Sequence, residues 1–80
     1  MDKSAKRYRE RTLIGRRLHR ARVRADLSLR AVGALSGVDF YKWRAWEKGK
    51  SSIPAELLMG VAAVVDLTAE QLLPSLRKAA

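Results

Sequence analysis

The sequence predicts an all-α domain of five short helices, and three observations carry this prediction. Apolar residues recur at the spacing of helix faces along most of the 80-residue chain. Capping residues, glycines and prolines divide this pattern into five segments. Neither an alternating strand pattern nor an internal repeat occurs, and 80 residues suffice for one core only.

The first helix is expected to begin at Thr12. Four apolar residues, spaced by four, three and four positions, then lie on one face. They are Ile14, Leu18, Ala21 and Ala25. Residues 1–11 are polar and basic, so we interpret them as a separate N-terminal arm or as a frayed extension of this helix. Residues 12–80 are then the folded domain.

Two short helices are expected next, separated by a tight turn. Ser28 is a good N-cap for the first, because its hydroxyl can accept a hydrogen bond from an amide of the next turn. Ser36-Gly37 ends that helix. Asp39 caps the second, which runs from Phe40 to Glu47 and is ended by Gly49.

A fourth helix begins near Pro54, whose missing N–H costs nothing in a first helical turn. Thr68 and Gln71 form the capping box of a fifth helix, which Pro74 limits. The apolar positions expected to face the core are Leu58, Met59, Ala62 and Val65, with Val61 on the flank, and then Leu72 and Leu73.

The charge of the chain is high and unevenly distributed. Seventeen Lys and Arg against eight Asp and Glu give a net charge of +9. Residues 1–30 hold eleven basic and three acidic residues, a net +8 (11 minus 3), which leaves +1 for residues 31–80. A folded domain this basic typically binds a polyanion, either a nucleic acid or an anionic membrane surface.

Composition excludes several classes of protein. Without cysteine, disulfides and thiolate metal sites are impossible, and His19 is the only histidine. No catalytic constellation stands out, so we expect no enzyme, no metal and no cofactor. The sequence shows no export signal and no apolar run that could cross a bilayer, so a cytoplasmic protein without a membrane partner is expected.

Residues 29–48 have the parts of a helix-turn-helix, in which two short helices joined by a glycine turn place the second in a DNA major groove. Gly33 is small enough to let the two helices approach, and Gly37 makes the turn. The apolar seam between them consists of Val32, Val38, Trp43 and Trp46.

Seven ordered features extend this motif from Ile14 to Leu73. They are Ile14-Gly15, Arg22, Leu27-Ser28, Gly37-Val38, Glu47-Lys48-Gly49-Lys50, Pro54, and Ala62 to Val65. Together they resemble the Cro/C1-type helix-turn-helix proteins, the XRE-like family. The resemblance implies a compact five-helix, lambda-repressor-like domain with a basic N-terminal arm. It also implies a partly buried ion pair between Arg22 and Glu47.

The resemblance, with the docking geometry of the motif, implies which residues contact double-stranded DNA. Base contacts are expected from Tyr41, Lys42, Ala45 and Phe40. Contacts to the DNA backbone are expected from Ser28, Leu29, Arg30, Arg44, Lys48, Lys50, Ser51 and Ser52. Candidates for contacts by the arm are Lys6, Arg7, Arg9 and Arg11. In the alternative interpretation, Phe40 and Tyr41 contact the core or a protein, and the basic segments are merely solvated.

Three features depart from the family pattern. Leu29 replaces a glutamine that binds a phosphate, so this contact is lost or left to backbone amides at the helix N-terminus. Trp43 replaces a smaller seam residue, and Gly33 and Ser36 are expected to leave room for it. The outward face around Phe40 and Tyr41 is less polar than in most readers of base edges.

The functional prediction is a sequence-specific DNA-binding regulator, a repressor that acts as a homodimer on a palindromic operator. The resemblance places the dimer surface near Ile53, Leu57, Leu67, Ala69 and Leu72. A monomer that binds DNA beside a partner is an alternative. Two other functions stay open: an antitoxin-like module that binds a toxin protein, and a nonspecific nucleic-acid or membrane-surface binder driven by the basic N-terminal segment.

Overall fold

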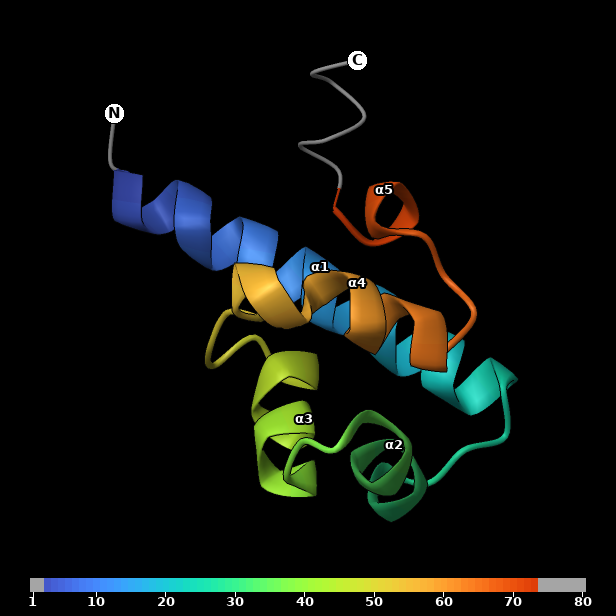
Figure 1. Cartoon of the computed structure of the whole chain (residues 1–80). Helices are drawn as coiled ribbons and strands as arrows, with labels where there is room; N and C mark the ends of the chain where they lie inside the picture. The colour runs from blue at the N-terminus through green and yellow to red at the C-terminus, as the bar shows by residue number, and fades with distance from the viewer. Residues whose placement is uncertain (1–2, 74–80) are drawn as a thin grey trace.

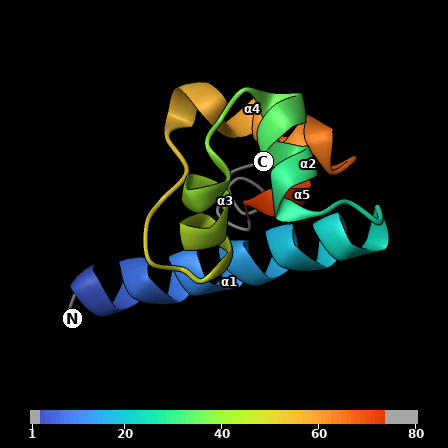
Figure 2. The ribbon, with the colours of Figure 1, turned by 90° about the horizontal axis from the view of Figure 1, so that it is seen from below.

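Helix α1 (Lys3–Arg24) spans the length of the molecule, and four shorter helices lie on one side of it (Figures 1 and 2). The computed structural model describes residues 3–73, and it describes side chains from residue 7 onward. The helices are α1 (Lys3–Arg24), α2 (Leu29–Ser36), α3 (Phe40–Glu47), α4 (Ala55–Val64) and α5 (Ala69–Leu72). Because the described residues form five helices and no strand, the all-α prediction is confirmed.

The N-terminal residues continue α1. The helix begins at Lys3, so residues 3–11 follow the second of the two interpretations, an extension of the first helix. At the other end, Asp26 adopts a left-handed conformation with φ 59°. This conformation stops α1 and turns the chain toward α2.

The predicted caps of α2 and α3 are confirmed. The Ala31 amide donates to Ser28 Oγ at 3.0 Å, and the Tyr41 amide donates to Asp39 Oδ1 at 2.8 Å. Gly37 ends α2 with φ 71°, a conformation that glycine adopts at little steric cost. Its N–H donates to the Gly33 carbonyl, which closes the helix.

Helices α4 and α5 begin where predicted, but Leu73 and Met59 do not lie as expected. Pro54 directly precedes α4, and both hydrogen bonds of the capping box between Thr68 and Gln71 are present. Leu73 lies just beyond α5 in an extended conformation, and Pro74 lies outside the described residues. Met59 was expected in the core, but its side chain is 78% exposed, and Val61 is buried instead.

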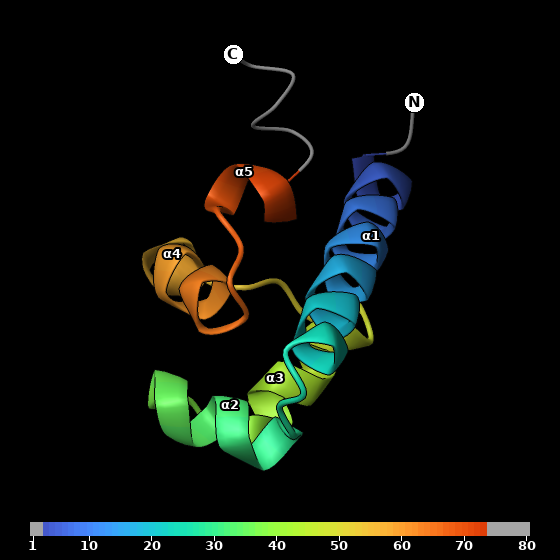
Figure 3. The same cartoon turned by 90° about the vertical axis from the view of Figure 1, so that its right-hand side faces the viewer.

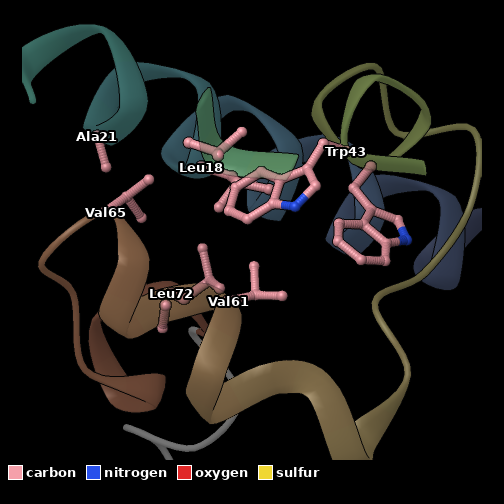
Figure 4. Packing of buried hydrophobic residues seen from close by; sticks show 9 residues of the cluster. Leu18, Ala21, Trp43, Val61, Val65 and Leu72 are labelled. Atoms are coloured by element: carbon pink, nitrogen blue, oxygen red, sulfur yellow. The ribbon is translucent and has the colours of Figure 1, made fainter. Parts of the chain in front are cut away.

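The core lies between α1, α2, α3, α4 and α5, where side chains from all five helices meet (Figure 4). Its buried members are Leu18, Ala21, Val32, Trp43, Trp46, Val61, Ala62, Val65 and Leu72. Leu72 is fully buried within the chain itself, so the expectation that it lies on a dimer surface is wrong. Figure 3 shows the resulting arrangement, with α1 on one side, α4 and α5 on the other, and α2 and α3 together at one end.

Ser36 receives the indole of Trp43, as expected, and the atoms nearest to Gly33 belong to Val38 and Phe40. Trp43 Nε1 donates to Ser36 Oγ at 2.9 Å, and this hydroxyl in turn donates to the Val32 carbonyl at 2.7 Å. A Cβ on Gly33 would lie 3.0 Å from the Val38 carbonyl oxygen and 3.3 Å from Phe40 Cβ. Gly33 therefore permits the close approach of α2 to the start of α3, and Ser36 holds the indole of Trp43 by a hydrogen bond.

We expect Ser36→Ala to lower the free energy of unfolding by about 2 kcal/mol, because the buried Trp43 N–H loses its acceptor. Chemical denaturation followed by tryptophan fluorescence measures the change. Ser52→Ala is the matched control, since Ser52 is exposed and its replacement should leave stability unchanged. Equal stabilities of the two variants would show that the indole hydrogen bond contributes little.

Candidate nucleic-acid interface

Helix α3 turns one face to the core and the opposite face to solvent. Trp43 and Trp46 are buried, which fixes the inward side of this eight-residue helix. At about 100° per residue, the side opposite the two tryptophans carries Tyr41, Arg44 and Lys48. All three are exposed, and Tyr41 is 65% exposed. The outward face is thus available to a partner.

Lys42 and Ala45 occupy the edge of this face. Lys42 is exposed but lies nearer the inward side than Tyr41, because it follows Tyr41 by one residue around the helix. Ala45 is half-buried, and its small side chain leaves the adjoining surface shallow. Of the predicted base-contacting residues, Tyr41 and Ala45 therefore lie on the outward face, whereas Phe40 and Lys42 lie on its two flanks.

Phe40 forms a stack with its neighbours. Its ring lies 4.3 Å from that of Tyr41, centroid to centroid, with an interplanar angle of 29°. The Arg30 guanidinium lies 5.0 Å from the Phe40 centroid, within the range of a cation–π interaction. Phe40 itself is half-buried, so the structure places it beneath Arg30 and beside Tyr41, where it restricts how both side chains can move.

The residues predicted to contact the DNA backbone form two groups around α3. At the start of α2, Ser28 uses its hydroxyl as the helix cap, Arg30 is exposed, and Leu29 packs against the core. The side chain of Leu29 thus packs inward, and only its backbone is left to contact a phosphate. After α3, the exposed residues of the second group are Lys48, Lys50, Ser51 and Ser52.

An ion pair ties α1 to the end of α3. Arg22 Nε donates to Glu47 Oε2 at 2.6 Å and Arg22 Nη2 to Oε1 at 3.0 Å, a two-point contact between planar groups. Arg22 Nη1 also donates to the Leu27 carbonyl at 2.9 Å. The Arg22 and Glu47 side chains are only 13% and 7% exposed. The pair expected from the family pattern is therefore in contact and largely shielded from water.

His19 belongs to the same cluster, which the sequence analysis did not foresee. His19 Nδ1 lies 2.7 Å from Glu47 Oε1, although the ring is 55% exposed. The spacing of His19 and Arg22 could have indicated this contact, because residues three apart on a helix are neighbours and His19 precedes Arg22 by three. Glu47 is therefore held from α1 by two side chains.

The N-terminal cations divide between solvent and interior. Arg7 and Arg9 are exposed on the first turns of α1. The side chain of Lys6 lies outside the described residues. Arg11 is half-buried, and its Nε is shielded from solvent with no hydrogen-bond partner among the described residues. Arg11 thus points inward, unlike Arg7 and Arg9.

Residues 3–73 bring no three metal-ligating side chains together. None of the helices described is both long and apolar enough to cross a membrane.

Comparison with known proteins agrees with the geometry. A family model described as a helix-turn-helix domain matches residues 13–74. The crystal structure of the restriction-modification controller protein C.AhdI from Aeromonas hydrophila is similar, with a TM-score of 0.75 and 25% sequence identity. This likeness covers 81% of the present chain and 94% of C.AhdI. No curated protein matches the sequence.

Proposed function

The chain belongs to the helix-turn-helix domain family of Cro/C1 type, a family of DNA-binding transcription regulators, and on this premise we propose that it is a sequence-specific repressor. The observation that carries the proposal is the exposed outward face of α3, on a helix held at its C-terminal end by Arg22. In this motif the N-terminal residues of the second helix contact base edges in the major groove. The likeness to a controller protein supports a regulatory role.

The side chains of α3 suit particular base edges. The Tyr41 ring and the Ala45 methyl offer apolar contact to the methyl group of thymine, and Lys42 can donate to guanine O6 and N7. Phe40 supports Tyr41 by stacking and reaches the groove only at its edge. Arg44 lies on the outward face with the backbone-directed cations.

The two groups around α3 are proposed to contact phosphates. Backbone N–H groups at the start of α2 favour an anion, and Arg30 stands beside them. Lys48, Lys50 and the two serines that follow lie where the chain leaves α3. Such contacts set the position of the protein on the duplex but carry no sequence information. Arg7 and Arg9 could extend them from α1.

We further propose that the repressor acts as a homodimer on a palindromic operator. A two-fold dimer places two reading helices about 34 Å apart, one turn of the duplex. The proposed dimer surface is reduced by the burial of Leu72 to Ile53, Leu57, Leu67 and Ala69, which are all half-buried. Gel filtration with and without DNA tests the oligomeric state.

Selection of bound sequences from a random DNA pool tests the function. The parent protein should enrich two inverted half-sites about 10 base pairs apart, centre to centre. Tyr41→Ala and Lys42→Ala should each relax the preference at one or more positions of the half-site. Arg16→Gln, an exposed change on α1, is the control and should select the parent motif. If both α3 variants also select the parent motif, our assignment of the reading face is wrong.

The stacked aromatic pair favours a second candidate, an antitoxin-like module in which Phe40 and Tyr41 contact a protein. Titration of DNA binding against salt distinguishes a specific repressor from a nonspecific nucleic-acid binder, because the nonspecific binder loses affinity steeply as salt rises and prefers no sequence. A specific repressor should retain a large preference for the selected motif over random DNA at physiological salt. Co-purification with a toxin would favour the second candidate.

A further inference from the structure

A cavity of about 250 Å³ lies between α1, the segment that joins α3 to α4, and the start of α4. Figures 1 and 2 show this segment passing from the end of α3, beside α1, toward α4. Six of the nine lining residues are apolar: Ile14, Trp46, Ile53, Ala55, Leu58 and Leu73. The cavity is thus distinct from the outward face of α3.

One cation lines this apolar cavity. Arg11 contributes its side chain to the wall, and its Nε is buried without a hydrogen-bond partner among residues 3–73. A buried donor that lacks an acceptor costs free energy, and a ligand that supplies an acceptor to the guanidinium would offset this cost. The other polar lining residues are Ser51 and Ser52, and the described lining contains no carboxylate that could neutralise Arg11.

We propose that this cavity binds a small organic acid with an apolar body. The planar guanidinium of Arg11 matches a carboxylate, which can accept from two of its N–H groups at once. The apolar body then lies against Trp46, Ile53 and Leu58. A cavity of about 150 Å³ already holds benzene, so the present one has room for a ring with a short acidic chain.

The cavity shares residues with the proposed DNA-binding surface. Ser51 and Ser52 line the cavity and belong to the group proposed to contact phosphates, and Trp46 is part of α3. A bound acid should therefore change the affinity for DNA, a consequence that rests on the proposed function. The binding of the acid does not rest on it, and it is tested on the protein without DNA.

The first experiment compares an acid with its uncharged analogue. We expect 3-phenylpropionate to change the tryptophan fluorescence saturably, because Trp46 lines the cavity, and to bind at least tenfold more tightly than 3-phenylpropanamide. Octanoate in place of 3-phenylpropionate shows whether the apolar part is a ring or a chain. Equal affinity for acid and amide, or no saturable binding of either acid by calorimetry, would overturn the proposal.

Three variants locate the site. Arg11→Gln should abolish the difference between acid and amide, whereas Arg16→Gln, with the same change of charge on the exposed face of α1, should retain it. Ala55→Phe, at the exposed first position of α4, should fill the cavity and remove binding while the helical circular-dichroism spectrum is kept. If Arg16→Gln weakens the acid as much as Arg11→Gln, the acid responds only to the general positive charge and the proposal fails.

Discussion

A Gly15→Ala variant is expected to lose about 2 kcal/mol of its free energy of unfolding, although alanine is the better helix former. A Cβ at position 15 would collide with the carbonyl oxygen of Trp46 and would lie 2.6 Å from that of Glu47. Both obstacles are backbone atoms of α3, so no side chain can rotate away. The helices must separate, and this disturbs the contact that fixes the reading helix on α1.

Thermal unfolding followed by circular dichroism measures this effect, and a fall in Tm of roughly 10 °C is expected for a domain of this size. Gly60→Ala is the matched control. Gly60 also lies within a helix, and a Cβ there would meet nothing within 4 Å. It should gain up to about 1 kcal/mol from helix propensity alone. If Gly15→Ala is as stable as Gly60→Ala, α1 and α3 do not pack as described.

The fold was predictable where its signals are local. Each cap involves residues within a few positions of one another, as between Ser28 and Ala31 or Thr68 and Gln71, so the side chain at which a helix begins can be recognised in the sequence. Most of the buried face of α1 was predictable for a similar reason, because Ile14, Leu18 and Ala21 stand out among arginines, whereas Ala25, also expected on this face, lies beyond the helix and is exposed. These signals were enough to predict the order and class of the elements.

The prediction failed where the sequence shows no contrast between an apolar and a polar face of a helix. Residues 57–64 of α4 carry no polar side chain, so helical spacing could not show that Val61 rather than Met59 faces the core. At the N-terminus the contrast is missing for the opposite reason, because nearly all residues are polar. Residues 3–11 are mostly charged, and lysine, arginine and glutamate form helices well without leaving an apolar face to mark one.

The site was predictable only as far as the motif extends. The exposure of Tyr41 and the contact between Arg22 and Glu47 were expected from the pattern of the family. The contact of His19 with Glu47 and the inward position of Arg11 depend on how α1 packs across the end of α3 and the segment after it. Such tertiary contacts join residues far apart in the chain and leave no periodic signal.

Glu47→Gln is expected to lower the free energy of unfolding by about 3 kcal/mol, because it leaves the Arg22 charge buried without a counter-charge. The amide keeps the shape of the side chain but cannot accept the two charge-assisted bonds of the guanidinium. His19→Gln is the control. Its ring is 55% exposed, so the loss of its contact with Glu47 should cost less than about 1 kcal/mol. Urea denaturation of the three proteins provides the comparison.

Arg22→Met combined with Glu47→Leu separates the stability of the pair from its geometry. Removing both charges should recover much of the stability lost in Glu47→Gln, because apolar side chains can replace a buried ion pair at little cost. The double variant should still bind DNA more weakly than the parent, since its apolar side chains cannot hold the end of α3 at a fixed angle to α1. The two single variants, Arg22→Met and Glu47→Leu, complete the comparison. If their losses of stability simply add in the double variant, with a coupling energy below about 0.5 kcal/mol, Arg22 and Glu47 act independently. Full DNA affinity in the double variant would mean that the pair does not orient the reading helix.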